Sequence, residues 1–215
     1  MRSTIAAVCC AVGFAAGALA DGPRTAGRTF DSERAGAPPE GFTLAAMRQS
    51  TPGQWTIRRE GDRGWLEHAG DPASRGFSLA IASGDALRDV SVSARVRLSG
   101  GARVGGVVWR YLDAHHYHAA ILDLDRGEIS MFRVSGGNRV KIESEDDLEL
   151  DPDAWHTIKA VHDDDLAYVT LGGIRVFEER SHDDRAAPGR AGVIAAGAAT
   201  MGVDDLRVEV PRSRR

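Results

Sequence analysis

The chain has 215 residues, with 31 acidic against 27 basic side chains and a formal net charge of −4. The sequence has no stripe or cluster of basic residues, which argues against a nucleic-acid-binding protein. Both cysteines, Cys9 and Cys10, lie within the first twenty residues, so no disulfide framework is expected in the rest of the chain.

The first twenty residues have the pattern of a secretory leader. An apolar run rich in small residues covers positions 5–19 and ends in an Ala-Leu-Ala triplet directly before Asp21. This A-x-A site predicts cleavage, and the run is shorter than the roughly 20 apolar residues that span a bilayer. We therefore expect residues 1–20 to be a signal peptide. The mature chain is expected to be a secreted or periplasmic bacterial protein without stable membrane insertion.

A short flexible tail is expected at residues 21–28, which are rich in Gly, Pro, Ala and Arg. The segment around Phe30 is the first that predicts a strand. From Gly41 onward, short apolar segments recur between Gly, Pro, Asp and Ser residues, and no long window has apolar residues at helical spacing. The pattern predicts one all-β domain over residues 29–210.

Residues 90–98 show the clearest strand alternation, with valine, alanine and leucine on one face and serine and arginine on the other. Strands at 104–111 and 117–124 follow, and we expect them to form a hairpin around the loop 112–116. The number of strands suits two packed sheets rather than one. The remaining strands are expected at 129–134, 139–143, 155–161, 166–171, 174–178, 193–195 and 201–210.

The order of motifs after residue 104 resembles a known family. These motifs are Gly-Gly-Val-Val-Trp-Arg-Tyr at 105–111, His-Tyr-His at 116–118, Asp-Ala-Trp-His-Thr-Ile at 153–158, Gly-Gly at 172–173, Gly-Arg-Ala-Gly-Val at 189–193 and Val-Asp-Asp-Leu-Arg-Val at 203–208. In this order they resemble the 3-keto-disaccharide hydrolase-like domain of unknown function, within the concanavalin A-like lectin and glucanase superfamily. The resemblance implies a concanavalin A-like jelly-roll sandwich of two antiparallel sheets.

Three aromatic residues are expected to pack rather than to bind a ligand. Alternation around Trp109 turns this side chain between the sheets, where large aromatic residues fill space. Trp155 is expected to cover the core where its strand begins. Phe30 is expected beside the last strand, which would bring the two ends of the domain together as in jelly rolls.

The histidine-rich loop raises the question of a metal site. His116 and His118 form an H-x-H pair, a spacing that holds zinc when a third ligand arrives from elsewhere. Alternation places His118 with Ala120 on the core side, whereas His116 falls in a loop. We therefore expect no catalytic metal and no cofactor. A structural calcium ion at the Asp-rich turn 163–165 stays open.

Glycoside hydrolysis needs a pair of carboxyl groups with different protonation states. The glucanase motif of the superfamily has three acids on alternate residues of one strand. The nearest match here is Asp-Leu-Asp-Arg-Gly at 123–127, with glycine in place of the third acid. No cysteine nucleophile and no Gly-x-Ser-x-Gly elbow is present in the mature chain. No catalytic residue is assigned, and if the protein is an enzyme we expect a glycosidase-type hydrolase.

A ligand face follows from the assignment of Trp109 to the core. Alternation then places Arg110, Tyr117 and Asp123 on the opposite, open face of the same hairpin. An aromatic ring stacks on the C–H surface of a sugar, while a guanidinium and a carboxylate hydrogen-bond its hydroxyl groups. These three residues are the predicted ligand-binding residues. A cross-strand Arg–Asp pair beside a half-exposed tyrosine explains the same pattern without a ligand.

Three functions stay open at this point. The first is an exported carbohydrate-binding domain that acts on extracytoplasmic glycans or disaccharides, which the missing acid triad favours. The second is a glycoside hydrolase-like enzyme that acts on ordinary or 3-keto-disaccharides, which the resemblance favours. The third is a structural or protein-interaction sandwich without a small ligand. The sequence assigns neither the ligand nor the oligomeric state.

Overall fold

The computed structural model describes residues 26–47, 52–152, 154–180 and 187–211. The expected signal peptide and residues 21–25 of the expected tail lie outside the described residues. Within the described ranges, no helix is long and apolar enough to cross a membrane.

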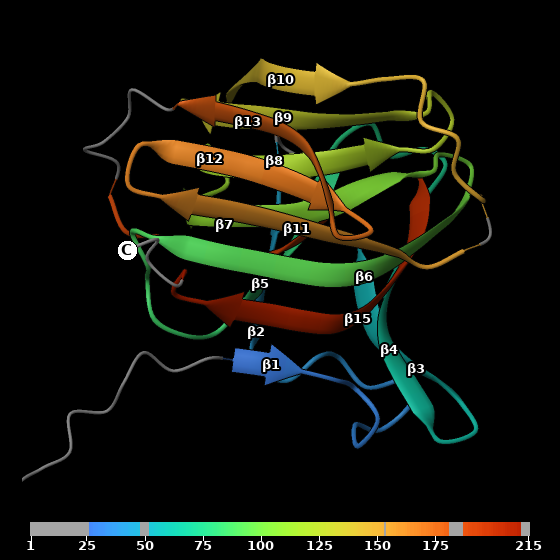
Figure 1. Cartoon of the computed structure of the whole chain (residues 1–215). Coiled ribbons are helices and arrows are strands. Elements are labelled where there is room, and N and C mark those ends of the chain that lie inside the picture. Colours follow the sequence, from blue (N-terminus) through green and yellow to red (C-terminus); the bar gives the residue numbers. More distant parts are fainter. Residues whose placement is uncertain (1–25, 48–51, 153, 181–186, 212–215) are drawn as a thin grey trace, which may run out of the picture.

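Two antiparallel sheets pack face to face, as Figure 1 shows. The expected all-β sandwich of two antiparallel sheets is therefore confirmed. From edge to edge, the 8-stranded sheet contains β13 (Ile174–Arg180), β12 (Leu166–Leu171), β11 (His156–Asp163), β6 (Val90–Gly100), β15 (Ala199–Glu209), β4 (Arg63–Ala69) and β3 (Gln54–Glu60), with β1 (Ala26–Arg28) paired to β15. The 7-stranded sheet contains β10 (Asn138–Glu145), β9 (Glu128–Ser135), β8 (His116–Asp123), β7 (Val104–Asp113), β14 (Arg190–Ala196), β5 (Phe77–Ala82) and β2 (Phe42–Ala46).

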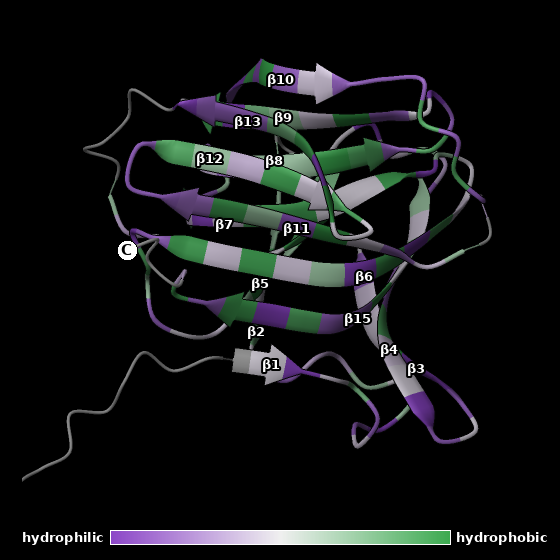
Figure 2. Ribbon diagram, viewed as in Figure 1, coloured by the Kyte–Doolittle hydropathy of each residue, from purple (hydrophilic) through white to green (hydrophobic). Residues whose placement is uncertain are grey.

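The main core lies between the sheets and follows from strand alternation. In β6, Val92 and Val96 are fully buried, whereas Arg95 between them is partly exposed. Figure 2 shows such alternation as green and pale bands along β6 and as green and purple bands along β15. Trp109 is fully buried in this core, as expected. Burial of one such large apolar side chain stabilises the fold by about 1.5–3 kcal/mol.

The N-terminal end of the domain differs in detail from the expectation. β1 already begins at Ala26 and pairs with β15, with Arg28 opposite Leu206. The strand therefore lies within the segment expected as tail and ends before Phe30. Phe30 itself is fully buried in the core between the sheets. The first and last strands of the domain lie side by side, as Figure 1 shows.

Trp155 does not cover the core as expected. It lies on the outer face of the 8-stranded sheet, where the guanidinium groups of Arg95 and Arg97 lie 5.2 and 5.0 Å from its ring centroid. Gly202 below leaves room for the indole, because a Cβ there would lie 3.1 Å from the Trp155 ring. The outward-facing arginines bind this ring through cation–π contacts, so it stays on the surface of the sheet.

A second apolar layer covers the outer face of the 7-stranded sheet, opposite the main core. Apart from Met47, which directly follows β2, its side chains come from alternate positions of strands that also supply the main core. We call this layer the outer cluster. It consists of Met47, Leu79, Ile81, Val108, Tyr117, Ala119, Ile121, Phe132, Val134 and Ile194.

Candidate functional site

Arg110 does not lie on the face that alternation predicts. The register between β7 and β8 shifts between Trp109 and Asp113, and Arg110 has a φ of 47°. Such an irregularity breaks the alternation of the strand. The Arg110 side chain is 3% exposed, and its Nε donates to the carbonyl oxygen of Arg88 at 2.8 Å. Burial lowers the pKa of His162, which faces the core, and the positive charge of Arg110 lowers it further. The expectation that Arg110 points to the open face is wrong.

Tyr117 lies on the predicted face, but other side chains cover it. It is 3% exposed and belongs to the outer cluster, where its hydroxyl donates to Sδ of Met47 at 2.9 Å. The centroid of the Tyr111 ring, which lies within the irregular stretch of β7, is 6.2 Å from the centroid of the Tyr117 ring. Burial raises the pKa of Tyr117 to about 12. A ring covered in this way offers no open surface on which a sugar could stack.

Asp123 lines an open cleft of about 430 Å³ on the outer face of the 7-stranded sheet. Its Oδ1 accepts hydrogen bonds from the backbone N–H groups of Asp125 and Arg126, both at 3.1 Å. The turn between β8 and β9 therefore holds this carboxylate in place. We call this the outer cleft and define it by Asp123 together with Phe77, Glu128, Phe132 and Arg139.

Glu128 places a second carboxylate in the outer cleft. It begins β9 directly opposite Asp123, because the two residues are cross-strand partners. Directly opposite side chains in an antiparallel pair have Cβ atoms about 5 Å apart. Lys141 and Ser130 donate hydrogen bonds to Oε1 of Glu128. These hydrogen bonds lower the pKa of Glu128, and the one from Lys141 has the larger effect.

Arg139 and two phenyl rings form one wall of the outer cleft. The Arg139 guanidinium lies 4.4 Å from the ring centroid of Phe132 and 5.3 Å from that of Phe77. Cation–π contact holds the guanidinium over these rings. Among the described residues it makes no hydrogen bond or ion pair, so its N–H donors stay available to a ligand. The Phe77 ring is partly exposed.

Sequence reasoning missed Glu128, Arg139 and both phenylalanines. The turn signal before Glu128 was visible, and the register across that turn places this residue opposite Asp123. The pairing of β10 with β9 then brings Arg139 beside Val134, next to Phe132. Phe77 arrives from β5, far away along the chain, and carries no local signal.

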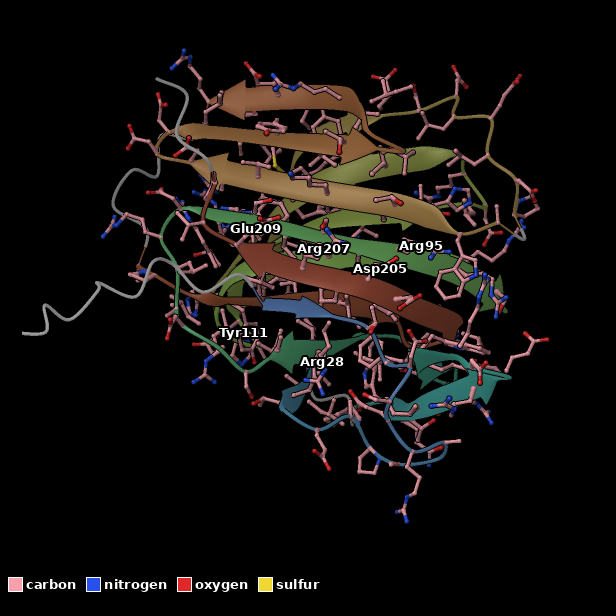
Figure 3. The ribbon with its side chains drawn as sticks, turned by 60° about the horizontal axis from the view of Figure 1, so that its bottom comes forward. Arg28, Arg95, Tyr111, Asp205, Arg207 and Glu209 are labelled. Atoms are coloured by element: carbon pink, nitrogen blue, oxygen red, sulfur yellow. The ribbon has the colours of Figure 1, made fainter. Side chains whose placement is uncertain are left out.

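A carboxyl group with a raised pKa lies outside the outer cleft. Burial, and after it the neighbouring Asp205, raises the pKa of Asp204 on β15 of the other sheet. Nη1 of Arg95 lies 3.7 Å from Oδ2 of Asp204 and 3.3 Å from Oδ2 of Asp205. Figure 3 shows Arg95 and Asp205 close together over β6 and β15. These acids belong to a surface ion-pair group of the 8-stranded sheet.

The two histidines of the H-x-H pair are separated by the fold. His116 is exposed at the start of β8, with its Nδ1 3.0 Å from Oδ1 of Asp113. His118 points into the core as expected, and its ring centroid lies 5.8 Å from that of Trp109 and 5.5 Å from that of His162. Among the described residues, no three His, Cys, Asp or Glu side chains are arranged to hold a metal ion.

The Asp-rich turn 163–165 shows turn chemistry and one ion pair. The backbone N–H of Asp164 donates to Oδ1 of Asp89 at 3.0 Å, and Nη1 of Arg180 donates to Oδ2 of Asp165 at 2.9 Å. Calcium binding at this turn stays a prediction.

No family model matches the chain, and no curated protein matches it in sequence. Solved structures share its fold. The carbohydrate-binding module CBM66 from Bacillus subtilis has a TM-score of 0.59 and 20% identity, over 79% of this chain and 95% of that chain. A second structure is domain 4 of AbnA, a GH43 extracellular arabinanase from Geobacillus stearothermophilus, in complex with arabinotriose. It has a TM-score of 0.57 and 13% identity, and the match covers 87% of this chain and 93% of that chain.

A third structure comes from work on endo-acting O-glycanases that members of the human gut microbiota express to initiate mucin breakdown. It has a TM-score of 0.61 and 11% identity, and the match covers 86% of this chain and 98% of that chain. At such identities the likeness shows the fold. The expected lectin-like sandwich is thus confirmed at the level of the fold.

Proposed function

We propose that this protein is an exported carbohydrate-binding domain and that its ligand lies in the outer cleft. The observation that carries the proposal is the arrangement in one cleft of two neighbouring carboxylates, Asp123 and Glu128, opposite a guanidinium that lies on phenyl rings. The fold shared with carbohydrate-binding modules supports it.

Each part of the outer cleft matches one part of a sugar. The carboxylates of Asp123 and Glu128 accept hydrogen bonds from hydroxyl groups, and Arg139 donates to ring or hydroxyl oxygens. The Phe77 ring and the side chain of Ile121 provide apolar surface for C–H groups. A volume of about 430 Å³ lies within the usual range of small-molecule sites.

The same two carboxylates bear on the alternative of a glycoside hydrolase. A retaining enzyme needs two carboxyl groups about 5–5.5 Å apart, one of them with a raised pKa so that it can protonate the leaving group. Asp123 and Glu128 are neighbours across the β8–β9 pair, but the hydrogen bonds from Lys141 and Ser130 lower the pKa of Glu128. A lowered pKa excludes Glu128 as the proton donor of such a pair, and in the proposed binding site it serves as a hydrogen-bond acceptor.

The test is a glycan-array screen of the purified protein, with calorimetry on the best oligosaccharide. Asp123→Ala and Arg139→Ala should each weaken binding by about tenfold or more, because each removes directional hydrogen bonds worth roughly 1.5–3 kcal/mol. Lys159→Ala, on the 8-stranded sheet, is the control and should bind like the wild type. Binding of no glycan, or equal affinity of all variants, contradicts the proposal.

A reducing-sugar release assay on the same oligosaccharides, and on 3-keto-disaccharides, separates binding from hydrolysis. We expect no release above the buffer blank. Release that disappears in Glu128→Gln would assign the hydrolase function to this cleft instead.

A further inference from the structure

A second cavity, of about 370 Å³, lies between the two sheets at the end where the edge strands β10 and β13 approach each other (Figure 1). We call it the inter-sheet cavity. His118 and His162, both buried, lie in its lining. Met131, Ile142 and Ala167 give it apolar walls. Met131 and His118 lie on the opposite side of the 7-stranded sheet from the outer cleft, and of the residues that line the cavity only Lys141, on the edge strand β10, also lines that cleft.

The hydrogen bond between Trp109 and His162 determines which nitrogen of His162 carries a proton. The indole Nε1 of Trp109 lies 3.2 Å from Nδ1 of His162. An indole N–H can only donate, so Nδ1 must accept and carries no hydrogen. Burial, and after it the charges of Arg110 and His118, lowers the pKa of His162 to about 3. The ring is therefore neutral, and its hydrogen is on Nε2.

The Nε2–H group of His162 is a buried donor on a residue that lines the cavity. The residue is 1% exposed, and among the described residues Nε2 has no hydrogen-bond partner. A buried donor without a partner costs about 1–3 kcal/mol, and nearly all such groups in folded proteins are satisfied. Because His162 lines the inter-sheet cavity, an acceptor that enters the cavity can satisfy it.

The surroundings indicate the chemistry of that acceptor. Arg110 is buried near enough to His162 for its positive charge to act on that ring, which favours an anionic acceptor. The apolar walls favour a hydrocarbon body. The lining also includes Arg133 and Glu179, together with Lys141 and Arg180, which form ion pairs with Glu128 and Asp165.

We propose that the inter-sheet cavity binds a small monocarboxylate, with one carboxylate oxygen accepting the hydrogen bond of His162 Nε2–H and the hydrocarbon part lying against Met131 and Ile142. This site is independent of the proposed carbohydrate site.

Hexanoate is the probe, and the indole N–H signal of Trp109 in ¹H–¹⁵N spectra is the reporter. The signal is assigned by its loss in Trp109→Phe. We expect a saturable shift of this signal with hexanoate and at least tenfold weaker binding of hexanol, which has the same chain length but no charge. A signal that stays unshifted at millimolar hexanoate means that water alone satisfies His162, and it overturns the proposal.

Two substitutions test the hydrogen bond itself. His162→Gln offers an amide oxygen to Trp109 and an N–H group to the ligand, so hexanoate binding should stay within about threefold of the wild type. His162→Leu removes both and should weaken binding by about tenfold or more, the loss expected for a hydrogen bond to a charged group. An unchanged affinity of His162→Leu for hexanoate contradicts the proposal. If that variant fails to fold, the comparison of hexanoate with hexanol on the wild type decides.

Asp123→Ala is the matched control in the outer cleft and should leave hexanoate binding unchanged. A loss of hexanoate affinity in this variant would place the carboxylate in the outer cleft and overturn the proposal. Failure of glycan binding with intact hexanoate binding would affect the proposed function alone.

Discussion

Trp109 on β7 donates its indole N–H to Nδ1 of His162 on β11, so a hydrogen bond joins the two sheets across the core. His118 packs against both rings, edge-on to His162. A buried polar pair adds specificity to a core that is mostly apolar, because the loss of one partner leaves the other without its hydrogen bond. It also links the stability of the sandwich to pH.

The stability of the domain should fall as the pH is lowered from about 6.5 toward 3. The pKa of His162 is about 3 in the folded protein, against 6.5 as its ordinary value. In this window the unfolded chain binds more protons, so unfolding becomes easier as the pH falls, by at most about 1.4 kcal/mol per pH unit. Above pH 6.5 this contribution is fully present.

Urea unfolding at pH 7.5, 5.5 and 4.5 measures this dependence. His162→Gln should flatten it, although part of the slope remains because burial also lowers the pKa of His68. His116→Gln, at an exposed position, is the control and should keep the slope of the wild type. An unchanged slope in His162→Gln contradicts the assignment.

Tyr117→Ala should destabilise the fold by about 3–5 kcal/mol, as large-to-small substitutions in a core do. The ring is buried in the outer cluster and is not a surface platform. Tyr117→Phe keeps the ring and loses the hydrogen bond to Met47, a loss of about 1 kcal/mol or less. Thermal melts check both values. Tyr117→Phe should bind glycans like the wild type, and a tenfold weaker affinity with an unchanged melt would show that the hydroxyl reaches the ligand.

Gly192→Ala should destabilise the 7-stranded sheet by about 1–3 kcal/mol, the usual cost of overpacking. A Cβ at Gly192 would lie 2.2 Å from the carbonyl oxygen of Ala80 on the neighbouring strand β5, so the strands would have to separate. Gly84→Ala is the matched control, because nothing lies within 4 Å of a Cβ there. Equal urea midpoints for the two variants would count against the close packing of β14 and β5.

The protein recovered outside the cytoplasm should begin at Asp21. The reason is the A-x-A site after an apolar run too short to span a bilayer. Intact mass spectrometry should show the loss of the first twenty residues, and a thiol assay should find no cysteine, because Cys9 and Cys10 leave with them. A full-length mass would show that the leader is retained.

The fold could be predicted because the alternation of apolar and polar residues is visible within each strand segment by itself. Residues 90–98 predict β6 and its buried face without reference to any other strand, and the structure has that strand at Val90–Gly100. Trp109 and His118 likewise reach the core as the alternation of their strands predicts. The two-sheet sandwich follows from many such segments, since each has one apolar face that must be buried.

The candidate site was only partly predictable, because its geometry depends on contacts between distant segments. Arg110 turns inward at an irregularity of β7 where Gly189 packs so closely that a Cβ there would lie 2.7 Å from Cα of Arg110. Tyr117 is covered partly by Met47, which is remote in the sequence. Of the predicted ligand-binding residues, Asp123 is placed in the cleft, and Glu128 joins it through the register of the hairpin.

The residue pattern alone specifies which side chains alternate along each strand, and therefore the class of fold. The packing of distant strands sets where that alternation is interrupted and which side chains cover each sheet face, and it brings Trp109 to His162 beside a cavity. The physical reason is the range of the interactions. Side-chain alternation is a property of one strand, whereas irregularities, cover and cavities arise only when strands far apart in the chain pack together.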